Sequence, residues 1–343
     1  MSVPEPYLAV GLQMRAWNAE AAADAKAARA GILEGINRLD RELAGTKAFL
    51  ETFTGRPLRL AVCPEYLFTG FPTGRVPDFA ARAAFAPEGV EEAALAGVAA
   101  RHGLYLAVNA YESDPHFPGL TFQACLVFAP AGALVLRYRR VQSLYTATPH
   151  DVLTEYVRVH GADQLFPVVE TAIGRLGCIA SEEILYPEIA RTLALKGAEV
   201  LLHSSSEQGS MLATPKQVAR RARAQESMAW LVSANTAGIE GGGLAGDSAD
   251  GNSAVIDYKG QVVAESLSGE NANAFAVIDI AAVRSARAAP GMGNLLARQR
   301  LELFRDTYAG SVWPADTRAG GRKADARDIL TGIIAERKRR GLI

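Results

Sequence analysis

The first half of the chain alternates between strand-like and helix-like patterns of apolar residues. Residues 7–14 alternate as in a half-buried strand, and Asn18 is placed to cap a long alanine-rich helix that ends near residue 53. Its apolar positions recur every three or four residues, which predicts one buried face, and its glycines are expected to interrupt it. The face consists of Ile32, Ile36, Leu39 and Leu43, and the glycines are Gly31, Gly35 and Gly45. Further along we predict strands at 58–63 and 104–111, a helix at 90–102, and a hairpin of 121–128 with 133–138.

The second half repeats this alternation. A short buried strand is predicted over 175–180, a helix with Pro187 in its first turn runs to about residue 196, and Ser181 falls on the sharp turn between them. Strands are predicted at 199–203, 230–235 and 274–279, a basic helix at 217–228, and a hairpin of 253–258 with 261–266. Residues 141–165 show no clear periodicity, and loops of that length are usually functional or disordered.

Two similar halves of alternating strands and helices predict the fold class. With hairpins inserted, they favour an α/β fold in which two helix layers flank two sheets. The sequence shows no short internal repeat and no Ser/Pro-rich linker that would separate two domains. We therefore expect one domain over residues 1–290 and a polar, helical C-terminal tail over 291–343.

Charge and cysteine content narrow the classes of partner. Lys and Arg number 36 against 37 Asp and Glu, and the formal net charge of -1 gives no general attraction to nucleic acid or anionic membranes. No stretch approaches the roughly 20 apolar residues of a membrane span, and the start of the chain lacks the basic residues of a secretion signal. The 3 cysteines are scattered in apolar runs, which indicates neither a disulfide framework nor a metal cluster. We expect a cytoplasmic protein without nucleic-acid or membrane partners.

Three chemically useful side chains each stand just past the end of a predicted strand. They are Glu65, Arg140 and Ser181. Ligand sites in open α/β sheets gather at the carboxyl ends of strands, where a carboxylate, a cation and a hydroxyl make a minimal apparatus for acyl transfer. The backbone N–H of Glu182 is placed to donate to an oxyanion. Taken singly, each has a plainer interpretation: Glu65 as a solvated turn residue, Arg140 as half of a surface basic pair with Arg139, and Ser181 as a helix cap.

The segments around these residues resemble the signature segments of the nitrilase superfamily of carbon–nitrogen hydrolases. They are Cys-Pro-Glu-Tyr-Leu-Phe-Thr-Gly-Phe-Pro at 63–72, Tyr-Arg-Arg at 138–140, and Gly-Arg-Leu-Gly-Cys-Ile-Ala-Ser-Glu-Glu from 174 with Tyr-Pro-Glu after it. The likeness covers roughly residues 5–290. It implies a four-layer αββα sandwich that forms a homodimer or higher homo-oligomer, with the amphipathic tail wrapping a partner subunit. It also implies a small-molecule substrate and neither cofactor nor metal.

The resemblance assigns roles to individual residues. In the family a glutamate is the general base, a lysine stabilises the tetrahedral oxyanion and a cysteine forms a thioester; the matching positions here are Glu65, Arg140 and Ser181. Many members carry a second glutamate between the lysine and the cysteine, and Glu155 is its best match. In that role Glu155 would orient the substrate amine.

Two of these positions depart from the family pattern. A serine hydroxyl depends on strong activation where a thiol is intrinsically nucleophilic, and the guanidinium of Arg140 keeps the charge but does not readily release a proton. Cys178, three residues from Ser181 along a strand, points to the opposite face. No lysine lies between Lys47 and Lys196, so none nearby in sequence replaces the missing cation. Ser181 is either a substitution made to trap a substrate or natural divergence, and both interpretations stay open.

We therefore predict hydrolysis, or acyl transfer, of a non-peptide C–N bond in a small amide, carbamoyl compound or nitrile through a covalent acyl-enzyme on Ser181. The alternative is a catalytically silent homologue that binds a small ligand or partner without hydrolysis. Candidate substrate-binding residues are Phe71, Tyr145, His203 and Ser204. The last two follow the strand next to Ser181, whereas core packing is the plainer interpretation of the two aromatic residues.

Overall fold

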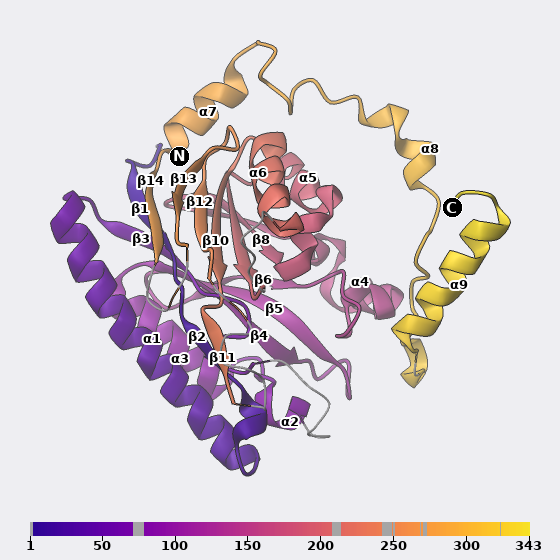
Figure 1. The fold of residues 1–343 in the computed structure, drawn as a ribbon, viewed down its shortest axis with the longest axis horizontal. Helices are drawn as coiled ribbons and strands as arrows, with labels where there is room; N and C mark the ends of the chain where they lie inside the picture. Colours follow the sequence, from indigo (N-terminus) through magenta and orange to yellow (C-terminus); the bar gives the residue numbers. More distant parts are fainter. Residues whose placement is uncertain are drawn as a thin grey trace.

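Two six-stranded sheets form the centre of the molecule (Figure 1). The structure is a computed structural model that describes residues 3–70, 79–207, 214–241, 249, 251–267, 269, 273–322 and 324–343. The first sheet has the order β14 (Ala274–Ile278), β1 (Tyr7–Gly11), β3 (Leu58–Val62), β4 (Tyr105–Ser113), β5 (Thr121–Phe128) and β6 (Leu134–Arg139). The second has the order β13 (Val262–Glu265), β12 (Ala254–Ile256), β10 (Trp230–Asn235), β9 (Val200–Ser205), β8 (Gly174–Ala180) and β7 (Val168–Thr171). A short parallel pair joins β2 (Arg15–Trp17) to β11 (Gly238–Glu240).

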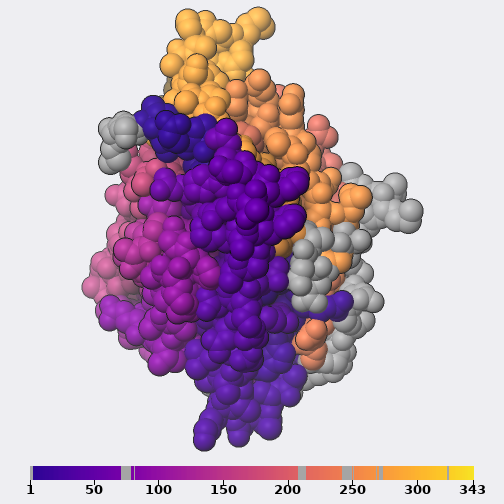
Figure 2. All heavy atoms as spheres, turned by 90° about the vertical axis from the view of Figure 1, so that its left-hand side faces the viewer, coloured from indigo at the N-terminus to yellow at the C-terminus, as the bar shows by residue number. Residues whose placement is uncertain are grey.

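Helices cover the outer face of each sheet. The first sheet carries α1 (Ala25–Thr54), α2 (Phe79–Ala83) and α3 (Val90–His102), and the second carries α5 (Pro187–Leu195) and α6 (Pro215–Ser227). Figure 2 views the molecule from the side on which α1 runs along its length. The remaining helices are α4 (Leu153–His160), α7 (Ile280–Ala288), α8 (Arg305–Tyr308) and α9 (Ala326–Arg339). Single 3₁₀ turns occur at η1 (Ala19–Ala21), η2 (Pro149–Val152), η3 (Ala162–Leu165), η4 (Ser181–Leu185), η5 (Leu301–Leu303) and η6 (Ala319–Gly321).

Separate apolar cores lie between successive layers. Ile36 of α1 packs with Leu106 of β4 beneath the first sheet, and Leu202 of β9 packs in the core between the sheets. Its neighbour Leu201 belongs to the core under α5 and α6, because successive side chains of a strand point to opposite faces. Both faces of the central strands are therefore buried, which explains their continuous apolar sequences. The predicted αββα sandwich is confirmed.

The first long helix differs from its prediction at both its start and its glycines. Asn18 caps only the turn η1, and α1 begins after Asp24, whose side chain accepts a hydrogen bond from the N–H of Ala27. The helix then runs unbroken to Thr54. Gly31 lies within the unbroken helix. The ring of Trp17 lies where a side chain at position 31 would stand. The glycine thus serves close packing rather than a break.

The segment at 141–165, predicted to lack regular structure, contains η2, α4 and η3. Tyr156 of α4 is buried with Phe117 and Phe122 in a small aromatic cluster. The amphipathic pattern of α4 spans only about two turns, too short to stand out from a polar sequence. Packing against these rings rather than intrinsic propensity stabilises such a short helix.

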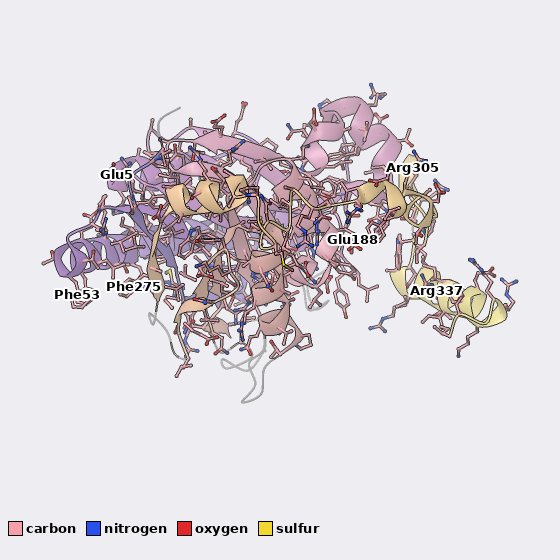
Figure 3. All side chains as sticks on the ribbon, turned by 90° about the horizontal axis from the view of Figure 1, so that it is seen from above. Glu5, Phe53, Glu188, Phe275, Arg305 and Arg337 are labelled. Atoms are coloured by element: carbon pink, nitrogen blue, oxygen red, sulfur yellow. The ribbon has the colours of Figure 1, made fainter. Side chains whose placement is uncertain are left out.

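The C-terminal residues extend away from the sandwich. After α7 the chain passes α5 and continues through α8 to α9, and Figure 3 shows Arg305 and Arg337 on this projecting segment. None of the residues of α9 is buried. The hydroxyl of Tyr308 donates a hydrogen bond of 3.0 Å to Glu188 at the start of α5. Among the described residues, no helix is both long enough and apolar enough to cross a membrane.

Candidate active site

Ser181 stands on a strained turn at the carboxyl end of β8. Its φ of 51° lies in the left-handed region that serine seldom adopts, and only 6% of its surface is exposed. His203 of the neighbouring strand β9 reinforces the turn, with Nε2 2.9 Å from the carbonyl oxygen of Ser181. A strained residue at a strand end is the geometry expected where a side chain must be presented rather than packed.

The carboxylate of Glu183 ties this turn to the loop after β6. It accepts hydrogen bonds from the N–H groups of Ala180 and Val141 at 3.0 and 2.8 Å, and from the hydroxyl of Tyr138 at 2.7 Å. Glu183 is fully buried, and burial raises its pKa although Arg140 and Tyr138 oppose the shift. This residue, which the sequence analysis did not single out, links the strand ends that carry Ser181 and Arg140.

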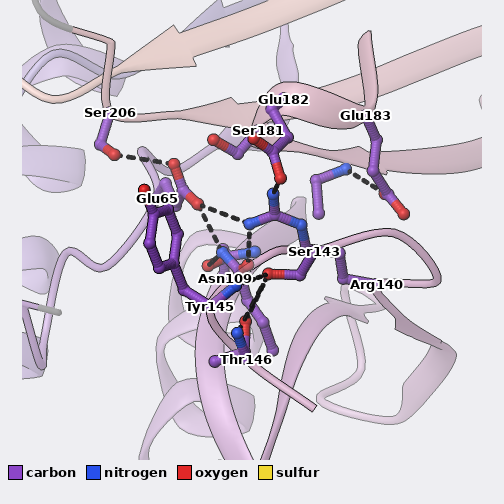
Figure 4. A network of polar contacts seen from close by, with 12 residues as sticks. Glu65, Asn109, Arg140, Ser143, Tyr145, Thr146, Ser181, Glu182, Glu183 and Ser206 are labelled. Atoms are coloured by element: carbon purple, nitrogen blue, oxygen red, sulfur yellow. Dashed lines mark hydrogen bonds and ion pairs between the residues drawn. The ribbon is translucent and has the colours of Figure 1, made fainter. Parts of the chain in front are cut away.

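Glu65 lies in a buried polar network just beyond β3 (Figure 4). One carboxylate oxygen accepts a hydrogen bond of 2.6 Å from the side-chain amide of Gln123, and the other accepts one of 2.7 Å from the hydroxyl of Ser206. The guanidinium of Arg140 lies 3.7 Å away. Since 1% of Glu65 is exposed, the interpretation as a solvated turn residue is wrong.

Arg140 is buried and bonded on several sides. Its side chain donates to the side-chain oxygen of Gln123 and to the carbonyl of Gln142, each at 2.7 Å, and pairs with the carboxylate of Glu182. The pKa of Arg140 is raised: burial lowers it, but surrounding groups, Glu65 among them, outweigh burial. Arg139 is also buried, against Glu112 and Asp114, so the interpretation of a surface basic pair is wrong.

A lysine distant in sequence reaches the nucleophile position. The Nζ atom of Lys216, the second residue of α6, lies 3.1 Å from Ser181 Oγ and 3.4 Å from Ser205 Oγ. Burial lowers the pKa of Lys216, against the opposing influence of Glu65 and Glu207. Lys216 is distant in sequence from residue 140, near which no replacement lysine occurs. A usable signal existed, because α6 begins shortly after the serines that end β9, at the same edge of the sheet.

The other predicted residues occupy different surroundings. Glu155 lies on α4 and pairs with Arg158 of its own helix, so within the described residues it does not join the network around Ser181. Ser204 donates a hydrogen bond of 2.9 Å to the carbonyl of Cys63, which joins the two sheets. Tyr145 is 79% exposed on the loop after Arg140. Phe71 lies outside the described residues.

Cys178 points away from the turn, into the core between the sheets. Its thiol lies against that of Cys125, and the pKa of Cys178 is raised well above its ordinary value by this contact and by burial. A thiol in that position is neither exposed nor ionised, so it offers no nucleophile. Among the described residues, no three His, Cys, Asp or Glu side chains group as metal ligands would.

Comparison with known proteins places this geometry in context. Residues 12–288 match the sequence model of the family described as carbon–nitrogen hydrolase. The chain is 26% identical over 248 residues to a nitrilase of Pyrococcus abyssi, covering 72% of this chain and 87% of the relative. It is 23% identical over 212 residues to an omega-amidase of Xenopus tropicalis, covering 62% and 74%. The chain is also 26% identical over 181 residues to a probable nitrilase of Schizosaccharomyces pombe. That match covers 53% of this chain and 62% of the relative's length.

Solved structures agree in fold. A carbon–nitrogen hydrolase from Helicobacter pylori superposes with a TM-score of 0.66 at 22% identity, covering 88% of this chain and 98% of the other. A cysteine-to-alanine mutant of an amidase from Nesterenkonia, of the nitrilase superfamily, gives 0.61 at 20% identity, covering 90% and 100%. With the family model matching most of its length, this chain belongs to the carbon–nitrogen hydrolase family.

Proposed function

We propose that the chain cleaves a non-peptide C–N bond in a small amide, carbamoyl compound or nitrile, by hydrolysis or acyl transfer, through a covalent acyl-enzyme on Ser181. One observation carries the proposal. Glu65 and Arg140 come from two strand ends of the first sheet and share one buried polar network, in which Arg140 also pairs with Glu182, the residue next to Ser181 at the end of β8 in the second sheet. Buried polar networks of this kind are costly to assemble, so their occurrence at strand ends indicates a site of chemistry.

In the proposed reaction Ser181 Oγ attacks the electrophilic carbon of the substrate. Glu182 is the second residue of η4, whose first N–H groups have no acceptor within the turn, so its N–H is the donor for the developing oxyanion. The carboxylate of Glu65 accepts hydrogen bonds from Gln123 and Ser206 and holds the polar groups around Ser181 in place. Arg140 balances the charges of Glu65 and Glu182 and fixes their positions.

Relatives and neighbours support the substrate class. The named activities among them are those of nitrilases, omega-amidases and a formamidase. Solved structures of the Nesterenkonia amidase include mutants in complex with butyramide or acrylamide. A further mutant shows covalent addition of the acetamide moiety of fluoroacetamide at its active-site cysteine. All of these compounds are small amides, and a small neutral amide also suits a site in which the charged groups already pair with one another.

The test is covalent trapping. The wild-type chain and Ser181→Cys are incubated with a panel of small amides, nitriles and carbamoyl compounds, and intact mass and ammonia release are followed. We expect an acyl adduct on residue 181 and faster turnover by Ser181→Cys, because a thiol is the stronger nucleophile. Ser311→Cys, which adds a thiol to an exposed position in the C-terminal segment, is the control. Absence of adduct and turnover in both wild type and Ser181→Cys would reject the proposal.

The bonding of Arg140 favours a second candidate, a silent homologue that binds a small ligand without converting it. The guanidinium is bonded to Gln123, Gln142 and Glu182 rather than presented to a substrate. The resemblance also matches Ser181 to the position of the family's cysteine. This candidate predicts that the native gene encodes both Ser181 and Arg140. It also predicts ligands that raise the melting temperature and are recovered unchanged. Sequencing of that gene tests the first prediction, and a thermal-shift screen with recovery of the ligands tests the second.

A further inference from the structure

The side chain nearest to Ser181 Oγ for proton transfer comes from α6 rather than from the residues matched to the family triad. Lys216 Nζ lies 3.1 Å from this oxygen. The two oxygens of Glu65 instead accept hydrogen bonds from Gln123 and Ser206. A proton acceptor must lie within hydrogen-bond reach of the proton that it takes, and Lys216 meets this requirement.

We infer that Lys216 is a catalytic residue that accepts the proton of Ser181 Oγ, so that the two form a serine–lysine pair. This inference rests on the proposed function. It differs from the family pattern, in which the lysine of the triad occupies the position of Arg140. Serine–lysine pairs perform acyl transfer on unrelated folds, because a neutral amine is a strong enough base for a hydroxyl.

The proposed proton path is balanced at each step. The Oγ–H proton moves to the neutral amine of Lys216 while Oγ bonds to the carbonyl carbon of an amide. The resulting ammonium returns that proton to the leaving nitrogen as the C–N bond breaks, which releases ammonia or an amine and leaves an ester on Ser181. Water then attacks the ester and gives a proton to Lys216, which passes it to Oγ as the carboxylic acid departs.

The surroundings of Lys216 favour the neutral amine that this path needs. Its side chain is half-buried near the positive end of α6, and an ammonium is disfavoured in both situations. Burial lowers the pKa of Lys216, with a further lowering by Arg220 and Arg140, while Glu65 and Glu207 oppose the shift. Ser205 Oγ, at 3.4 Å, offers a second contact that fixes the direction of Nζ.

The test measures acylation of Ser181 by p-nitrophenyl acetate in wild type, Lys216→Arg, Lys216→Met and Glu65→Gln. Arginine keeps a long hydrogen-bonding side chain but does not give up its proton to act as a base, so we expect Lys216→Arg to lose acylation by roughly 100- to 10,000-fold, and Lys216→Met by as much. The rate in wild type should rise with pH through the lowered pKa of Lys216. Neither Lys216 variant should show that rise. The control is Lys196→Arg, an exposed lysine that pairs with Asp163.

The outcomes separate the two proposals. Acylation of wild type with an unchanged rate in Lys216→Arg overturns the role of Lys216 and leaves the proposed function intact. Loss of acylation in Glu65→Gln but not in Lys216→Arg returns the role of base to Glu65. No label on residue 181 in either wild type or Ser181→Cys overturns the proposed function together with the pair. Circular dichroism of each variant identifies any loss that comes from misfolding, and Lys216→Arg is the more informative variant because it keeps a hydrogen-bonding side chain of similar length.

Discussion

The ring of His203 lies between the carbonyl oxygen of Ser181 and the hydroxyl of Ser233, at 2.9 and 2.8 Å. Burial lowers the pKa of His203 well below its ordinary value of 6.5, and Arg220 lowers it further. Protonation is therefore harder in the folded chain than in the unfolded one. The stability that this neutral ring contributes is present above about pH 6.5 and is lost as the pH falls below it.

This relationship predicts a pH dependence of folding stability. Below about pH 6.5 the wild type should lose up to about 1.4 kcal/mol of unfolding free energy per pH unit from this one group, and His203→Gln should lack that component. Urea denaturation over a series of pH values measures it. His116→Gln, at an exposed position, should behave as wild type. Equal slopes for wild type and His203→Gln would show that the ring is not held neutral.

The left-handed backbone of Ser181 predicts an unusual ranking of substitutions. At a φ of 51° glycine carries no steric penalty, whereas alanine keeps the Cβ that serine has. Ser181→Gly should therefore exceed Ser181→Ala in unfolding free energy by up to about 1 kcal/mol, although glycine usually destabilises relative to alanine. Chemical denaturation of the two variants compares them. A more stable alanine variant would mean that the turn relaxes without the hydroxyl.

Arg140→Lys introduces the lysine that the family resemblance predicts at this position, but it should destabilise this chain. The single ammonium of lysine cannot reach the separate acceptors on Gln123, Gln142 and Glu182 that the planar guanidinium of Arg140 bridges. Leaving buried groups unpaired should lower the unfolding free energy by roughly 1–3 kcal/mol. The exposed Arg158→Lys should change it by less than about 0.5 kcal/mol. An unchanged unfolding free energy in Arg140→Lys would show that the guanidinium is not needed for stability.

The C-terminal segment predicts a change of assembly. Apolar side chains such as Leu303, Phe304 and Tyr308 are exposed in the single chain, and a second copy of the chain is the partner that we propose for them. A chain ending at residue 290 should keep its secondary structure but elute with the mass of a monomer in size-exclusion chromatography with light scattering. If the full chain is itself a monomer, the proposed arm has no such role.

Local patterns predicted the regular elements well where their ends were marked. The helix Val90–His102 ends at Gly103 in the left-handed conformation, and the strand Trp230–Asn235 begins shortly after the end of α6; both match the predicted bounds. Strand β7 was missed, because its residues are half-exposed and show little apolar alternation. Its pairing with β8 supplies what the local sequence lacks.

The candidate site was predictable in its strand ends but not in its full set of contacts. The apolar strands before Glu65, Arg140 and Ser181 determined which end of each sheet they share. The start of α6 after the serines of β9 indicates the edge of the sheet that Lys216 shares, but its approach to Ser181 depends on how α6 packs against η4, β10 and β12, which is a tertiary relationship. The sequence likewise did not indicate that Arg140 is buried against Glu182, since charged residues are usually exposed.

The strand order of the first sheet has a consequence for synthesis of the chain. Tyr7 of β1 pairs with Ile278 of β14, so β1 has one neighbour that is translated long after it. At typical translation speeds of roughly 5–20 residues per second, that edge of β1 stays unpaired for tens of seconds. Closure of the sheet is therefore a late, long-range event, and a ribosome-stalled chain that stops before residue 274 should expose an edge that chaperones recognise.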